Sequence, residues 1–81
     1  MIKLDKKTLD EFIRITNKYI STGDTDFLEK KYVIQKKLLD NVKFPKANIR
    51  DVIYELCVMK TPYSKIYEVL NVLGFEVITD G

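Results

Sequence analysis

The residue types that carry out covalent or acid–base chemistry are scarce in this chain. Its 81 residues include one cysteine, three glycines and no histidine. The candidate nucleophiles are Cys57, Ser21 and Ser64. Such a nucleophile is normally activated by a neighbouring base, most often a histidine, and the sequence supplies none. Cys57 also falls on the apolar side of a predicted helix, where we expect a buried structural thiol.

The acidic residues do not complete a metal-binding or hydrolytic motif. Asp24, Asp26 and Glu29 have part of the spacing of a calcium loop, but its glycine and its remaining ligand positions are missing. Zinc is excluded because imidazole and thiolate ligands are nearly absent. No glycine-rich loop is present to hold a phosphate. We therefore expect no catalytic residue, no metal and no cofactor, and we predict that the protein is not an enzyme.

Positive charge is concentrated in the middle of the chain. The formal net charge is only +2, which is too small for the global field of a strong nucleic-acid binder. Acidic residues dominate from residue 51 onward. The candidate basic face consists of Lys30, Lys36, Lys37, Lys43, Lys46 and Arg50. Such a face is either a solvated surface or a ridge that follows phosphates, and the sequence leaves both interpretations open.

Four apolar side chains fall outside the predicted core faces of their helices. They are Tyr54, Val58, Val33 and Val72. Tyr54 and Val58 are four residues apart, so they share one stripe on a helix. Contiguous exposed apolar residues mark an interface, and tyrosine is a favoured anchor there. The four are therefore the candidate partner-binding residues. The alternative is that the predicted helical phases are shifted by one residue and that these side chains pack inside.

Two helices are predicted in the first half of the chain. The first begins near Asp5 or at Thr8, and Thr8 with Glu11 has the spacing of a capping box. It ends at Gly23, a residue suited to a left-handed cap. The second begins at Asp24–Asp26. Its apolar arc includes Lys31 and Gln35, and we expect their stems at the rim of the core and their polar ends in water.

Two further helices are predicted after a break at Val42–Pro45, where Phe44 is expected to be extended because a proline follows it. Asn48 is the expected N-cap of the third helix. Thr61 is the expected cap of the fourth, with Pro62 in its first turn. Gly74 is expected to end that helix.

The predicted fold is all-α. We expect one domain, residues 1–81, of four short helices, with at most a minimal two-stranded β-ribbon from Ile2–Leu4 and Phe75–Ile78. The expected core residues are Phe12, Ile13, Ile34, Leu38, Ile53, Leu56, Ile66 and Leu70.

Residues 49–78 resemble the first part of helix-turn-helix modules in phage, plasmid and mobilisation regulators. The residues that carry this resemblance are the short turn Lys60-Thr61-Pro62, then Tyr63-Ser64-x-Ile66, and finally Leu70-x-x-x-Gly74. The resemblance implies a pair of helices and, as a function, DNA binding. Residues 62–72 carry only Lys65 and Glu68 as charges, which suits the reading of a DNA groove poorly.

From these observations we expect a small, cytoplasmic interaction or regulatory protein that binds a partner protein or a second copy of itself. The single cysteine fits a reducing compartment, and no apolar run is long enough to cross a membrane. The small size and the Lys-, Ile- and Asn-rich composition suit a phage or mobile element. The alternative function is a small helix-turn-helix-like regulator that binds DNA or RNA.

Overall fold

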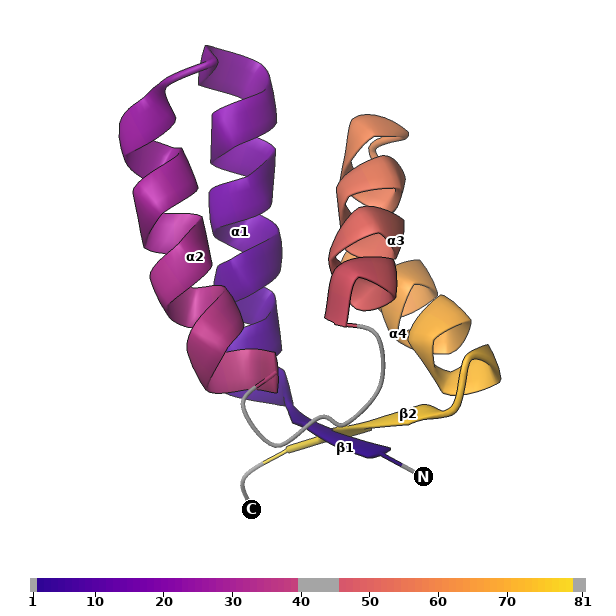
Figure 1. Ribbon diagram of the computed structural model, residues 1–81. Coiled ribbons are helices and arrows are strands. Elements are labelled where there is room, and N and C mark those ends of the chain that lie inside the picture. Colours follow the sequence, from indigo (N-terminus) through magenta and orange to yellow (C-terminus); the bar gives the residue numbers. More distant parts are fainter. Residues whose placement is uncertain (1, 40–45, 80–81) are drawn as a thin grey trace.

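The computed structural model describes residues 2–39 and 46–79 (Figure 1). Over these residues the chain forms four helices and a small two-stranded sheet. In chain order the elements are β1 (Ile2–Asp5), α1 (Lys6–Thr22), α2 (Thr25–Leu39), α3 (Lys46–Val58), α4 (Tyr63–Val72) and β2 (Phe75–Ile78). The expected four-helix domain with a terminal ribbon is confirmed.

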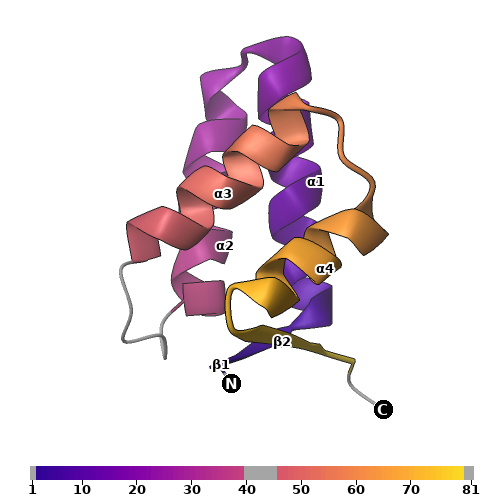
Figure 2. The same cartoon turned by 90° about the vertical axis from the view of Figure 1, so that its right-hand side faces the viewer.

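Helix α1 is the central element. It packs against α2 on one side and against α3 on the other, and α4 lies over β2 (Figures 1 and 2). α4 is tied to α1 by the Tyr67 hydroxyl, which donates a hydrogen bond to Asp10 Oδ1. Asp10 also accepts from Lys6 Nζ at 2.8 Å. A surface that α1 forms with a neighbouring helix is therefore supported by contacts to α1, the central helix of the fold.

The caps of α1 differ in part from the prediction. Asp5, and not Thr8, caps the helix: Asp5 Oδ2 accepts from the Thr8 backbone N–H at 3.0 Å and from the Thr8 hydroxyl at 2.7 Å. The predicted capping box is therefore wrong, because the helix already begins at Lys6 and Thr8 lies inside its first turn. Gly23 ends α1 as predicted, with a φ of 70° and its N–H bonded to Tyr19 O at 2.8 Å.

The prediction for the starts of the other helices holds at α2 and fails at α3 and α4. Asp24 Oδ1 accepts from Asp26 N–H at 2.9 Å, so this acidic residue caps the start of α2. The predicted cap at Asn48 is wrong, since α3 already begins at Lys46. The predicted cap at Thr61 is also wrong: Pro62 occupies the N-cap position of α4 and makes no side-chain capping bond. The expected break at Val42–Pro45 lies outside the described residues.

Both strands lie at one end of the molecule, where they pair in parallel (Figure 1). Ile2 is opposite Phe75 and Asp5 is opposite Ile78, and Ile2 N–H also bonds Gly74 O at 3.0 Å. Gly74 adopts a φ of 97°, which lets the chain turn directly from α4 into β2. Leu4 and Phe75 point from this sheet into the core.

The core contains seven of the eight predicted residues. Leu56 is the exception, because it is only partly buried at the edge of the cluster. The sequence prediction did not include Leu4 or Phe75 among the core residues, and both are buried. The buried apolar set is Leu4, Leu9, Phe12, Ile13, Ile15, Ile34, Leu38, Leu39, Ile49, Ile53, Cys57, Ile66, Leu70 and Phe75.

Candidate functional site

Helix α3 presents an apolar stripe to solvent. Tyr54 is 40% exposed and Val58 is 51% exposed, as their positions outside the predicted core face indicate. Met59, the first residue after the helix, is 74% exposed. The prediction that Tyr54 and Val58 share an outward face is confirmed. We refer to Tyr54, Val58 and Met59 as the α3 stripe.

Val33 and Val72 are exposed as well, but they do not extend this stripe. Val33 lies on α2 in a second hollow, which α1 and α2 form together. Val72 is the last residue of α4, whereas Val58 is the last residue of α3, and these two helices end at opposite ends of the molecule (Figure 2). The four candidate partner-binding residues therefore belong to three separate places on the surface.

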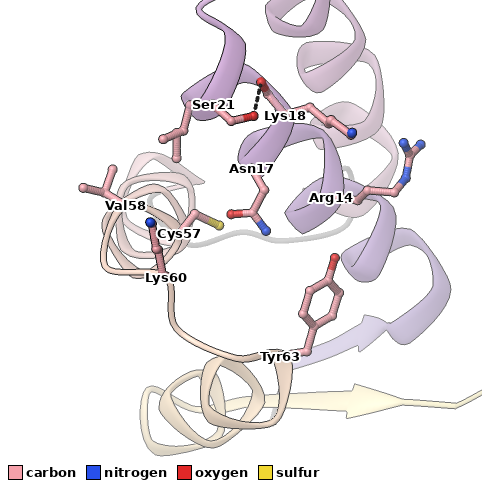
Figure 3. A pocket seen from close by; sticks show the side chains of 9 residues that line it. Arg14, Asn17, Lys18, Ser21, Cys57, Val58, Lys60 and Tyr63 are labelled. Carbon is pink, nitrogen blue, oxygen red and sulfur yellow. Dashed lines mark hydrogen bonds between the residues drawn. The ribbon is translucent and has the colours of Figure 1, made fainter.

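A groove adjoins the α3 stripe, between α1 and the turn that joins α3 to α4 (Figure 3). Its volume is about 550 Å³. The residues that line it are Arg14, Asn17, Lys18, Ile20, Ser21, Cys57, Val58, Lys60 and Tyr63. We call it the α1–α3 groove. Because Val58 belongs to both the stripe and the groove, the two form one continuous surface.

The cations of this groove were not among the predicted site residues. Arg14, Lys18 and Lys60 line it, and no carboxylate does. Arg14 and Lys18 are four residues apart and so share a face of α1, which the sequence could have indicated. Lys60 lies far along the chain from both, and nothing in the sequence pairs it with α1.

The predicted basic face is only partly assembled. Lys30 and Lys37 line the hollow between α1 and α2 together with Arg14, Glu11 and Val33, and we call it the α1–α2 groove. Lys36 is exposed and lies outside both grooves. Arg50 Nε lies 3.9 Å from Asp51 Oδ1. Lys43 and the side chain of Lys46 fall outside the described residues.

Lys31 contradicts the prediction that its polar end lies in water. The residue is only 5% exposed. Its ammonium nitrogen lies 5.6 Å from the centre of the Phe12 ring and 5.1 Å from that of the Tyr54 ring. Burial lowers the pKa of this amine, and the nearby charge of Arg50 lowers it further. Lys31 therefore joins α1, α2 and α3 through cation–π contacts beneath Tyr54.

Gln35 also departs from the prediction that its polar end is hydrated. Its Oε1 atom is buried, and it has no hydrogen-bond partner among the residues that the structure describes. Both polar residues inside the apolar arc of α2 thus have buried polar groups. Sequence periodicity places them on the inward face but does not reveal how closely α1 and α3 approach Lys31.

Cys57 is the structural thiol that the sequence predicts. It is 3% exposed, and burial raises the pKa of its thiol from 9.0 to about 11. The sulfur lies at the floor of the α1–α3 groove (Figure 3). At neutral pH it is a protonated, apolar surface for anything that occupies the groove.

Tyr63 closes the other side of the groove, and its hydroxyl points toward α1 (Figure 3). Partial burial raises the pKa of this phenol, and the charge of Asp10 raises it further. The hydroxyl is therefore a neutral hydrogen-bond donor. Asn17 supplies a second neutral polar group from α1. The groove can offer cations, neutral donors and an apolar floor to one ligand.

The chain matches no protein-family model, no curated protein and no solved structure in the comparisons made. None of the helices in the described part of the chain is both long enough and apolar enough to cross a membrane.

Proposed function

We propose that this is a non-enzymatic interaction protein that binds a partner protein through the α3 stripe. One observation carries this proposal: Tyr54 and Val58, four residues apart, lie exposed on a helix whose opposite face is in the core, and the exposed Met59 directly follows that helix. Isolated exposed apolar residues are common on soluble proteins, whereas contiguous ones are typical of interfaces.

The position of Tyr54 supports its role as the anchor. Lys31 contacts its ring from below, so the ring is held in place while 40% of the residue stays accessible. A side chain that is already fixed loses little conformational entropy when a partner covers it. Tyrosine is enriched among the residues that contribute most to binding for this reason and for its size.

The test is a selection of short random peptides against the full chain at physiological salt. We expect a peptide family with apolar anchors whose affinity falls about tenfold or more in the Tyr54→Ala variant. Tyr32→Ala is the matched control, because Tyr32 is 52% exposed on α2 and lies in neither groove. Binding that survives Tyr54→Ala, or falls equally in both variants, contradicts the proposal.

A second copy of the chain is one form that the partner could take. Light scattering on the wild type and on Tyr54→Ala decides this case. A dimer that the substitution converts to a monomer identifies the partner as the protein itself. A monomer in both samples leaves a different protein as the partner.

A small nucleic-acid-binding regulator is the second candidate function. It is favoured by the cations around Arg14, which lines both grooves. Lys18 and Lys60 also line the α1–α3 groove, and Lys30 and Lys37 also line the α1–α2 groove. The helix pair α3–α4 corresponds to the segment that resembles helix-turn-helix modules. However, Lys65 and Glu68 on α4 pair with each other at 3.2 Å, which leaves that helix little charge for phosphates. Affinity for duplex DNA that falls steeply with salt would favour this function over the first.

A further inference from the structure

We propose that the α1–α3 groove binds an acidic segment of the partner, whose carboxylates contact Arg14, Lys18 and Lys60 while its apolar side chains cover Cys57 and Val58. This inference rests on the proposed function, because it names the kind of partner that the α3 stripe binds. It is argued from the charge of the groove, the backbone at Lys60 and the apolar floor.

The groove carries three cations on its lining and no carboxylate, although the charge of Asp10 is felt at Tyr63. None of its three cations forms an ion pair within the described residues, whereas Lys6, Arg50 and Lys65 each lie within 4 Å of a carboxylate. Three unpaired cations around one hollow make a positive potential that favours anionic ligands and repels cationic ones. Of the macromolecular ligands, an acidic protein segment brings both the charge and the apolar side chains that this surface can accept.

The backbone at Lys60 gives an independent reason to assign the groove a function. Lys60 has a φ of 57°, a left-handed conformation in which glycine is favoured and a lysine is strained. The conformation is fixed by the end of α3, where Lys60 N–H bonds Cys57 O at 3.0 Å and Thr61 N–H bonds Leu56 O at 2.9 Å. Glycine would serve this turn better, so the lysine side chain that extends beside Cys57 and Val58 (Figure 3) is explained by what it binds.

The rest of the lining suits carboxylates and apolar groups together. Asn17 and Tyr63 point into the space between α1 and the turn, where they can donate to carboxylate oxygens (Figure 3). Ile20, Cys57 and Val58 form the apolar part. A volume of about 550 Å³ holds a few side chains rather than a folded domain. A nucleic-acid strand would match the cations but would leave this apolar floor uncovered.

The first part of the test reads the charge of the selected peptides. We expect the family that depends on Tyr54 to combine Asp or Glu with apolar residues. We then compare the best peptide with the same peptide in which every Asp and Glu is replaced by its amide, using fluorescence anisotropy on the full chain. We expect the amide form to bind about tenfold or more weakly and to lose most of its salt dependence.

The second part uses protein variants with a matched control. We expect Lys18→Glu to weaken the acidic peptide about tenfold or more, and Lys7→Glu to change it less than about twofold. Lys7 is exposed on the same helix and lies outside both grooves. Lys60→Gly is the most informative variant, because it removes the charge and relieves the backbone strain together. It should bind the peptide more weakly while its melting temperature rises.

Three results would overturn the inference, and they can be told apart from failure of the proposed function. Peptides that need Tyr54 but bind equally well as acids and as amides would leave the function standing without an acidic partner. If Lys18→Glu and Lys60→Gly leave the affinity of the acidic peptide unchanged, its carboxylates contact another part of the surface. The third result is a single-stranded oligonucleotide that binds the wild type more tightly than any selected peptide and loses this affinity in the same two variants. That result would assign the groove to nucleic acid. If the selection yields no peptide, the proposed function itself fails.

Discussion

The ammonium group of Lys31 is buried between two aromatic rings, with no carboxylate at ion-pair distance in the described part of the chain. Two opposing effects act on it. Cation–π contacts with the rings are worth about 1 kcal/mol each. Removal of a charged amine from water costs several kcal/mol unless hydrogen bonds replace the lost hydration. On these magnitudes the second effect is the larger one, and burial lowers the pKa of the amine.

We therefore expect Lys31→Met to raise the free energy of unfolding by about 1 kcal/mol at neutral pH, because it keeps the apolar stem and removes the charge. The gain should shrink as the pH approaches 10.5, the ordinary pKa of lysine. In that range the folded wild type has already released the proton that the unfolded chain still holds, so wild-type stability rises with pH. Urea unfolding at several pH values measures both effects, and a loss of stability in Lys31→Met would mean that the ring contacts dominate.

Cys57 should make the protein less stable in alkali. Its thiol has a pKa of about 11 in the folded chain against 9.0 in the unfolded one, so between these values only the unfolded chain loses the proton. The folded state then loses about 2 kcal/mol relative to the unfolded state across this range. The unfolding free energies of wild type and Cys57→Ala are compared at pH 8 and at pH 11. The comparison isolates this loss, because the tyrosines and lysines titrate in both proteins. Parallel pH profiles for the two proteins would contradict the assignment.

The individual residues of the candidate site were predictable only in part. The exposure of Tyr54 and Val58 is predictable because it follows from their positions around a single helix. Lys31 was misplaced because its burial depends on the approach of two other helices, which periodicity within α2 does not contain. Lys60 was missed because its relation to Arg14 and Lys18 exists only once α3 has folded back against α1.

At the level of elements, glycine positions and local caps define where helices stop. Gly23 adopts a φ of 70°, and a methyl group added at its α-carbon would meet no atom within 4 Å. The whole cost of a substitution there is therefore conformational, without steric overlap from packing. This makes the α1–α2 connection a clean place to measure the contribution of a left-handed cap.

We expect Gly23→Ala to lower the free energy of unfolding by about 1 kcal/mol, and Gly23→Asn to lower it by less, because asparagine tolerates the left-handed region better. Thermal unfolding followed by circular dichroism measures both. Ser21→Ala is the control, since Ser21 is exposed in the same helix and its hydroxyl bonds only Lys18 O, at 3.2 Å. If Gly23→Ala and Ser21→Ala behave alike, the cap contributes little.

The elements themselves were mostly predictable, because their signals are local. The apolar face of α1 and the end of this helix at Gly23 can each be predicted from a few neighbouring residues. The incorrect predictions concern the first turns of the helices. Polar residues at suitable spacing are predicted as caps at three places, Thr8, Asn48 and Thr61. In each case the helix starts elsewhere, and at α1 Asp5, three residues before Thr8, supplies the capping oxygen.

At the scale of the whole molecule, the described charges are arranged differently from their order along the chain. The sequence places the basic residues in the middle, but the structure gathers Arg14, Lys18, Lys30, Lys37 and Lys60 around α1. This arrangement follows from the central position of α1, which both grooves share. Such a surface could not be derived from any single segment, because it is made of residues from two helices and a turn.

The parallel pairing of β1 with β2 also has a mechanical consequence. The two strands run in the same direction, so residues 2 and 78 lie at opposite ends of the pair. A stretching force applied between these residues would act along the strands and load the interstrand hydrogen bonds together, instead of opening them one after another. The helices behind the sheet would bear little tension until these bonds gave way. Under load, the smallest element of the fold would act as its clamp.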